Sequence, residues 1–382
     1  MFSARNLVGG ATKSQEQRKL GLDLVRALAI ASVLIAHFGY DAIVLLGKTP
    51  PSAIGHMGNG VELFFVLSGF LIGGLLIDII ANRPGIAAWT TFMIRRWMRT
   101  VPLYVLWMLV LLVVWPPSGY PTGNIFEYMT FTQNLCWPMT LGNWYGQSWS
   151  LAVEEWFYLL FSAAVIGATA IWSRKSIIPI CILFIVAPLV ARILFASDVA
   201  GWGSMRVIAA YRLDAIAYGV IVIWIYSRYT EIVRRWSLVF LIVGVCFVVS
   251  AYSIPSSLRP WTFTFLPLGF SLCLPATLAF NVRSALIVWP IAWLSTRSYG
   301  LYIVHFLFAE LLPAGYGSRY LSLGFRVSLA VGFSVILAEL SYRFVETPIL
   351  VRRPKQFRER SIAKETRSGA PESRLRVGVA AS

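Results

Sequence analysis

An arginine and a histidine share the first apolar stretch of the chain, and both side chain types take part in group-transfer chemistry. The stretch covers residues 22–46, reads LDLVRALAIASVLIAHFGYDAIVLL and carries Arg26 and His37. At about 100° per residue, their spacing predicts one shared helix face and a separation of roughly 16 Å along the axis. Both groups are costly in a membrane unless they face a polar interior. The alternative is a helix-end arginine and a hydrogen-bonded buried histidine.

Two adjacent carboxylates lie near the start of a later apolar stretch, residues 149–171. Glu154 and Glu155 occur in SWSLAVEEWFYLL, and their side chains diverge by about 100° on a helix. Because a lipid-facing carboxylate is costly, at least one is expected to face the interior of the bundle. An imidazole with a pKa of about 6.5 suits a general base, and a carboxylate is able to orient it. His37, Glu154 and Glu155 are therefore the candidate catalytic residues.

Further polar and aromatic side chains within or beside apolar stretches mark a candidate substrate path. Ionisable groups at membrane depth either link helices or line a functional path, and their number here favours the path. Five aromatic rings near the outer face either stack on a sugar or form an interfacial belt, which is the commoner arrangement. They belong to Trp144, Tyr145, Trp149, Trp156 and Tyr158. The candidates for this path are Ser68, Trp149, Arg212, Asp214, Ser298, Tyr302 and His305.

A cluster of arginines precedes the third apolar stretch, in FMIRRWMRTVPLY. Arg95 and Arg99 are four residues apart and are expected to share a helix face, with Arg96 about 100° away from Arg95. One interpretation is a positively charged anchor at the cytoplasmic membrane surface. The other is a phosphate clamp, because guanidinium groups bind phosphate oxygens in pairs of hydrogen bonds.

The composition identifies the class of protein. Of 382 residues, 58% are hydrophobic and 13% charged, and the charged fraction is about half that of a soluble protein. The pattern is typical of a polytopic membrane protein. The four cysteines and three histidines are scattered, so no metal site is expected.

Apolar segments predict about ten membrane-spanning helices, since lipid requires each segment to satisfy its own backbone groups. The third is short, and the ninth is a candidate for a break near Ser298. The predicted spans are 22–46, 59–81, 100–116, 149–171, 177–196, 205–226, 236–253, 261–280, 287–312 and 321–347.

The placement of lysine and arginine predicts that both termini lie in the cytoplasm. The loop 117–147 carries neither residue type, whereas the segments on the opposite side hold most of them, so the net charge of +16 indicates topology and not nucleic-acid binding. We expect a cytoplasmic segment over 1–20, a transmembrane domain over 21–350 and a basic, disordered cytoplasmic tail over 351–382. The first apolar stretch is too long for a cleavable signal peptide and is expected to remain as an anchor.

Seven motifs in order resemble the acyltransferase 3 family of membrane-bound O-acyltransferases, over about residues 20–350. They are Arg26 and His37 in their spacing, GVELFFVLSGFLI, RRWMR, SWSLAVEEWFYL, RLDAIAYG, SYGLYIVH and YRFVETP.

The resemblance implies a multi-pass protein of the inner (plasma) membrane that takes an acyl group, usually acetyl, from cytoplasmic acyl-CoA. It implies a hydroxyl acceptor on a polysaccharide, O-antigen, lipopolysaccharide or lipo-oligosaccharide at the outer side. It also implies that Arg26 and His37 are essential, and that Arg95, Arg96 and Arg99 lie near the donor. Arg26 is assigned to donor binding because a straight helix keeps it away from His37. Some family members carry an additional hydrolase-like domain, and this chain is expected to act without one.

A transporter or flippase of a glycan or lipid-linked intermediate is the alternative function, because such proteins also bury ionisable groups along a path. The two halves of the sequence show no inverted repeat of the kind that many transporters contain. Acyl transfer is therefore favoured.

Overall fold

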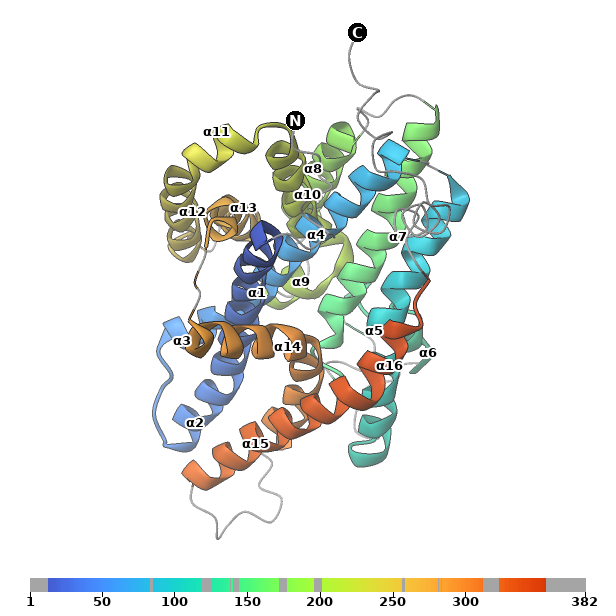
Figure 1. Ribbon diagram of the computed structural model, residues 1–382. Coiled ribbons are helices and arrows are strands. Elements are labelled where there is room, and N and C mark those ends of the chain that lie inside the picture. Colours follow the sequence, from blue (N-terminus) through green and yellow to red (C-terminus); the bar gives the residue numbers. More distant parts are fainter. Residues whose placement is uncertain are drawn as a thin grey trace.

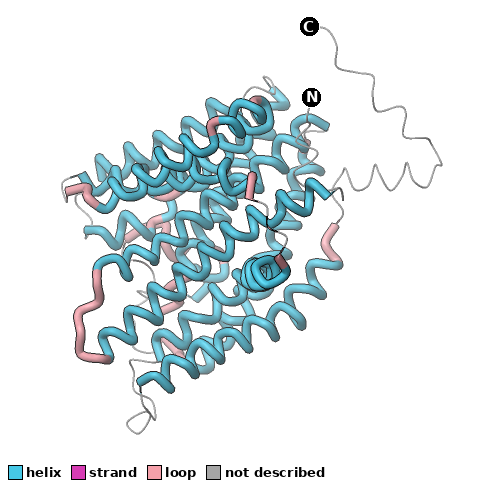
Figure 2. Tube along the Cα trace, turned by 60° about the vertical axis from the view of Figure 1, so that its left-hand side comes forward, coloured by secondary structure: helices cyan, strands magenta, loops and turns pink. Residues whose placement is uncertain are grey.

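The computed structural model is helical, with no strand among the residues that it describes (Figure 2). These residues are 13–354, except for 83–84, 118–124, 138, 140–143, 172–176, 196–200, 256–257, 281, 283 and 312–322. Residues 1–12 of the predicted cytoplasmic segment 1–20 lie outside the described residues. So do residues 355–382 of the predicted tail 351–382.

The described elements follow one another along the chain as helices and short helical turns (Figure 1). They are α1 (Lys13–Leu34), the π-helical turn η2 (Ile35–Gly39), α2 (Tyr40–Leu45), α3 (Ser52–His56), η3 (Met57–Asn59), α4 (Gly60–Asn82), α5 (Ile86–Val114), α6 (Ile125–Met129), α7 (Ser148–Ile171), α8 (Ile177–Phe195), α9 (Gly201–Val207), η5 (Ala209–Tyr211), α10 (Leu213–Arg228), α11 (Thr230–Arg235), α12 (Ser237–Tyr252), α13 (Arg259–Leu278), α14 (Ala285–Leu311), α15 (Leu323–Ser341), the π-helical turn η7 (Tyr342–Glu346) and α16 (Thr347–Val351).

Eight segments among the described residues are long and apolar enough to cross a membrane, so the polytopic class holds. The predicted count of ten is not confirmed, because α12 is a shorter apolar helix of 16 residues and α14 is not one of the eight. The eight are Leu20–Val44, Ser52–Asn82, Ile86–Val114, Ser148–Ile171, Ile177–Phe195, Ala209–Arg228, Arg259–Leu278 and Gly324–Val351.

Two predicted spans differ from the helices that the structure contains. The third was expected to begin at residue 100, but α5 begins at Ile86 and includes the whole arginine cluster. Charge lowers the hydropathy of those residues without interrupting the backbone hydrogen bonds, so the helix continues through them. The ninth is one continuous helix, α14, although it changes direction along its length (Figure 1).

Glycines bring α4 and α10 into direct backbone contact. A Cβ atom on Gly69 would lie 1.8 Å from the carbonyl oxygen of Ile216, and one on Gly219 would lie 2.0 Å from that of Val66. No larger residue fits at either position, since both contacts are to backbone atoms. Small residues at membrane helix interfaces permit this close approach, and here it fixes α4 against α10.

Described residues between α5 and α7 pack onto the bundle through aromatic side chains. The Tyr104 hydroxyl on α5 donates to the carbonyl of Tyr128 at 2.9 Å, and the Trp144 indole donates to the carbonyl of Trp115 at 2.7 Å. Tyr104, Tyr128 and Trp144 are all buried. This packing holds α5 beside α7 and so positions the arginine cluster next to the carboxylate pair.

Candidate active site

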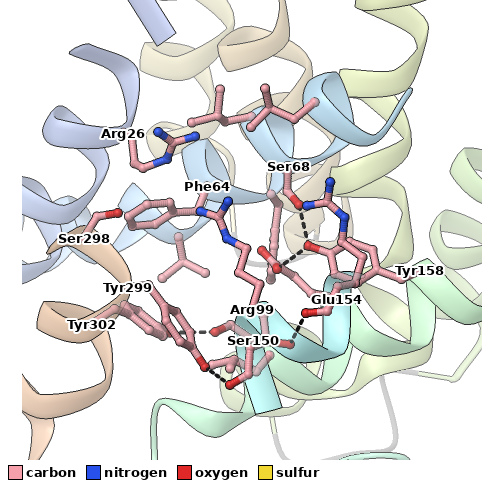
Figure 3. Close-up of a pocket in the computed structure, with 17 residues that line it drawn as sticks. Arg26, Phe64, Ser68, Arg99, Ser150, Glu154, Tyr158, Ser298, Tyr299 and Tyr302 are labelled. Atoms are coloured by element: carbon pink, nitrogen blue, oxygen red, sulfur yellow. Dashed lines mark hydrogen bonds between the residues drawn. The ribbon is translucent and has the colours of Figure 1, made fainter. Parts of the chain in front are cut away.

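A cavity opens between helices that are far apart in sequence, with walls from α1, α4, α5, α7 and α14 (Figure 3). Its volume is about 820 Å³ with the open mouth included. The lining residues are Arg26, Val61, Phe64, Phe65, Leu67, Ser68, Leu71, Arg96, Arg99, Thr100, Ser150, Leu151, Glu154, Tyr158, Ser298, Tyr299 and Tyr302.

Three guanidinium groups line this cavity. Arg26 comes from α1, where it donates to Ser295 at 2.9 Å and to Asp23 at 3.2 Å. Arg96 and Arg99 come from α5, and neither forms an ion pair among the described residues. The cavity therefore carries an excess of positive charge and suits an anionic ligand.

The arginine cluster is divided differently from the sequence prediction. Arg95, expected to act with Arg99, instead donates to the carbonyl of Pro354 and does not line the cavity, whereas Arg96 does. On a helix, Arg99 points between the other two, about 40° from Arg95 and 60° from Arg96. Spacing alone does not give the rotation of α5 about its own axis, and that rotation selects Arg96.

The two adjacent glutamates have different surroundings. Glu154 lines the cavity, where the Tyr158 hydroxyl donates to it at 2.5 Å and a second hydroxyl, that of Ser68, lies 2.6 Å from the Tyr158 hydroxyl (Figure 3). Glu155 accepts a hydrogen bond from Thr100 at 2.6 Å and does not line the cavity. The structure thus places Glu154, and not Glu155, at the cavity.

His37 does not line the cavity and has no carboxylate in contact among the described residues. Its Nδ1 bonds to the carbonyl oxygen of Val33 at 2.9 Å, and its ring packs edge-on against the ring of His305, with 4.9 Å between centroids. The expected orientation of His37 by Glu154 or Glu155 is therefore not what the structure contains. His37 lies in the π-helical turn η2, which interrupts the regular period used to place it on the face of Arg26.

Tyr302 lies between the cavity and the two histidines. It lines the cavity, its hydroxyl is 2.7 Å from that of Ser150, and its ring centroid is 5.7 Å from that of His305. Ser298, one turn earlier on α14, also lines the cavity. The polar residues predicted on this helix thus connect the cavity to the histidine pair.

Arg212 and Asp214, predicted on the substrate path, lie elsewhere in buried ion pairs. Arg212 pairs with Glu62 of α4 at 2.5 Å, and Asp214 pairs with Arg192 of α8 at 2.6 Å. All four side chains are buried, and none lines the cavity. Their positions correspond to the alternative interpretation, in which ionisable groups link helices.

Trp149 also lies outside the cavity, buried between Phe65 and Arg206. Its ring centroid is 5.9 Å from that of Phe65, and the Arg206 guanidinium lies 5.8 Å from the Trp149 ring. Arg206 is also within electrostatic range of His37. Trp149 therefore packs inside the protein and is not part of an exposed aromatic belt.

Several residues with polar contacts at these sites were missed in the sequence, because their partners are remote along the chain. Arg192 and Glu62 lie in apolar stretches and were not singled out there, and Tyr158 was grouped with the outer aromatics. Buried arginines in apolar segments are a usable signal, since each requires a buried partner. No group of three or more His, Cys, Asp or Glu able to hold a metal ion occurs in the described part of the chain.

Comparisons with known proteins agree with the motifs. The peptidoglycan O-acetyltransferase OatA of Listeria monocytogenes is 27% identical over 365 residues, covering 86% of this chain and 55% of that protein. The putative peptidoglycan O-acetyltransferase YrhL of Bacillus subtilis is 24% identical, covering 96% of this chain and 61% of that protein. Putative O-acetyltransferases of Staphylococcus aureus are 26% identical, covering 90% of this chain and 59% of their own length.

The chain thus spans between half and two thirds of the length of these relatives. No solved structure matches it significantly. The family model described as an acyltransferase domain matches residues 19–339, which confirms the resemblance seen in the motifs. Since this match covers most of the sequence, the chain belongs to the acyltransferase 3 family.

Proposed function

We propose that the chain is a membrane-bound O-acyltransferase that moves an acyl group, acetyl in the first instance, from cytoplasmic acyl-CoA to a hydroxyl of a cell-surface or exported glycan. The observation that carries this proposal is the cavity, where Arg26, Arg96 and Arg99 meet from two helices beside Glu154. The names of the relatives support acetyl as the group and a glycan such as peptidoglycan as the acceptor. Lipo-oligosaccharide is a second acceptor class of the same chemistry.

Acyl-CoA fits the cavity by charge and by shape. Its phosphates are matched by guanidinium groups that carry several donors each, and Arg96 and Arg99 have no internal carboxylate partner among the described residues. The apolar wall, from Phe64 and Leu71, suits the uncharged arm of the donor. Arg26 is held in place by hydrogen bonds to Asp23 and Ser295.

His37 acts as the general base in this proposal. The carbonyl of Val33 only accepts, so the neutral ring carries its hydrogen on Nδ1 and keeps a lone pair on Nε2. That lone pair takes the proton of the acceptor hydroxyl while the hydroxyl oxygen bonds to the acyl carbon of the donor. The carbon–sulfur bond of the thioester then breaks, and CoA leaves as the thiolate. Tyr302 lines the cavity and packs against His305, the ring in contact with His37, so the thioester end of the donor would pass Tyr302 to reach His37.

We further propose that the protein spans the plasma membrane ten times, with both termini in the cytoplasm. The helices α12 and α14 would be added to the eight long apolar segments to give this number. The asymmetry of Lys and Arg in the sequence supports this orientation. It puts the cavity arginines toward the cytoplasmic side, where CoA is present, and His37 toward the outer side, where the glycan is exported. Surrounding lipid is the remaining partner.

The test is transfer of radiolabelled acetyl from acetyl-CoA to a glycan by the purified chain in proteoliposomes. His37→Ala should lower transfer by roughly 10²–10⁴-fold, the usual contribution of a general base. His56→Ala is the matched control, because His56 stacks on Tyr252 with 4.1 Å between centroids and does not line the cavity. Full transfer by a folded His37→Ala protein would overturn the assignment of the base. Glycan movement without consumption of acetyl-CoA would indicate a transporter.

A further inference from the structure

The two histidines His37 and His305 form a ring pair that joins the π-helical turn η2 to α14. Their centroids are 4.9 Å apart with 66° between the ring planes. Phe38 and Tyr302 also pack against His305, with centroids at 6.4 Å and 5.7 Å. His305 is completely buried, so this ring meets only protein.

The hydrogen bonds of the pair determine which nitrogen carries the proton. The Nδ1 of His305 lies 3.1 Å from the carbonyl of Leu301, four residues earlier, just as that of His37 lies near the carbonyl of Val33. Because carbonyls only accept, both neutral rings hold hydrogen on Nδ1 and a lone pair on Nε2. The Nε2 of His305 is buried and has no hydrogen-bond partner among the described residues. Such a group is costly, and an apolar side chain would fill the space without that cost.

If His37 acts as a base, it becomes positively charged, and none of the described carboxylates contacts it to balance that charge. When the imidazole of His37 takes a proton, the new positive charge arises within electrostatic range of Arg206. Like charges at short range disfavour each other in a medium of low dielectric constant. Glu154 and Glu155 are bonded to Tyr158 and Thr100, and neither contacts His37. The ring in contact with His37 is that of His305.

We infer that His305 is a positioning residue for acyl transfer, acting through His37 with its unpaired Nε2. This inference rests on the proposed acyltransferase function. The proton still passes from the acceptor hydroxyl to His37, and His305 exchanges none. Its neutral ring holds the orientation of His37, and its lone pair and π face stabilise the imidazolium during the step. In a triad a carboxylate has this role.

Two amide substitutions separate the nitrogen that is proposed to act from the nitrogen that only anchors the ring. In His305→Asn the amide nitrogen replaces Nδ1 and keeps the bond to Leu301. In His305→Gln the longer amide reaches the Nε2 position. We expect His305→Gln to retain transfer within about tenfold, and His305→Asn and His305→Leu to lose roughly 100-fold in kcat, the scale of a misplaced catalytic group. Donor KM should be unchanged in all three, because His305 is outside the cavity.

Wild-type protein gives a second measurement that does not depend on folding of a variant. With only three histidines in the chain, ¹⁵N-histidine NMR in nanodiscs resolves each ring, and the His56→Ala and His37→Ala variants assign the signals. Hydrogen on Nδ1 and none on Nε2 of His305 is expected. Hydrogen on Nε2 of His305 would overturn the inference, as would equal kcat for folded His305→Asn and wild type. Absence of acyl transfer by the wild type with every glycan offered would instead overturn the proposed function on which the inference rests.

Discussion

Two regions of the bundle bury arginine in opposite ways. Around α10, Arg192 and Arg212 are completely buried, and each is bonded to a carboxylate of another element at 2.6 Å and 2.5 Å. At the cavity, Arg96 and Arg99 have no such carboxylate among the described residues, and the nearby Glu154 is bonded to a tyrosine. The first region uses its charges to join helices, and the second keeps positive charge available for a ligand. Presence of a charge at membrane depth therefore does not by itself identify a functional residue. Arg96 and Arg99 differ from the buried pairs because they line a cavity without a carboxylate partner among the described residues.

The largest effect should come from breaking a buried pair. Asp214→Asn leaves the Arg192 guanidinium buried without its counter-ion, and we expect a loss of about 3–5 kcal/mol in the free energy of unfolding. Replacing both partners by apolar residues, Arg192→Met with Asp214→Leu, should cost much less. Denaturation in detergent micelles measures both. A stable Asp214→Asn protein with impaired transfer would return Asp214 to the substrate path and erase the contrast between the two regions.

Lysine substitution at the cavity should change donor binding with little change in stability. Arg96→Lys and Arg99→Lys keep the charge but lose the planar fork, and each should cost roughly 1–3 kcal/mol in donor binding, seen as a higher acetyl-CoA KM. Arg95→Lys is the matched control on the same helix, since Arg95 bonds to Pro354 and not to the cavity. If Arg95→Lys raised the KM as much as the other two, the cluster would act only through its total charge.

The two glutamates allow a finer test of the same contrast. Glu154→Gln replaces a charged acceptor of the Tyr158 hydroxyl by a neutral one, so we expect a loss of roughly 1 kcal/mol in transfer, or about fivefold in rate. Glu155→Gln retains an acceptor for the Thr100 hydroxyl, and because Glu155 itself does not line the cavity, this variant should transfer at the wild-type rate. Steady-state kinetics on both proteins decides this. The reverse order would mean that Glu155 is the cavity carboxylate in the working protein.

The smallest effect is expected for an ion pair at the exposed surface. Arg343 pairs with Glu339 at 2.5 Å, but its side chain is 67% exposed, and Glu339 keeps a second partner in Arg297 at 2.8 Å. Arg343→Ala should therefore change the free energy of unfolding by less than about 1 kcal/mol and leave transfer intact. A larger loss of unfolding free energy in the same denaturation assay would show that exposed ion pairs stabilise this protein as much as buried ones do.

The sequence predicted the helical membrane architecture because hydropathy and helix length are local properties. It failed at the start of α5, where Arg95, Arg96 and Arg99 interrupt the apolar pattern but not the helix. Its count of about ten spans is not confirmed, because α12 has only 16 residues and α14 is not among the eight long apolar segments of the described residues.

For the site, the sequence found most of the polar residues but not their partners. Arg26, Ser68 and Ser298 do line one cavity, which residue type and depth suggested. Arg212 and Asp214 have the same residue chemistry and depth, yet pair with Glu62 and Arg192. Helix rotation and neighbour choice decide between these outcomes, and both depend on contacts between segments far apart in the chain.

The glycine contact between α4 and α10 also governs how the cavity is able to change shape. Because Gly69 and Gly219 put two backbones in direct contact, these helices cannot slide or rotate against each other without collision. α4 supplies one wall of the cavity, and that wall therefore moves only together with α10 and its ion pairs. Widening to admit a bulky donor is therefore expected from the other walls, α1, α5, α7 or α14. The wall from α4 is thus expected to keep its shape while substrate and product exchange.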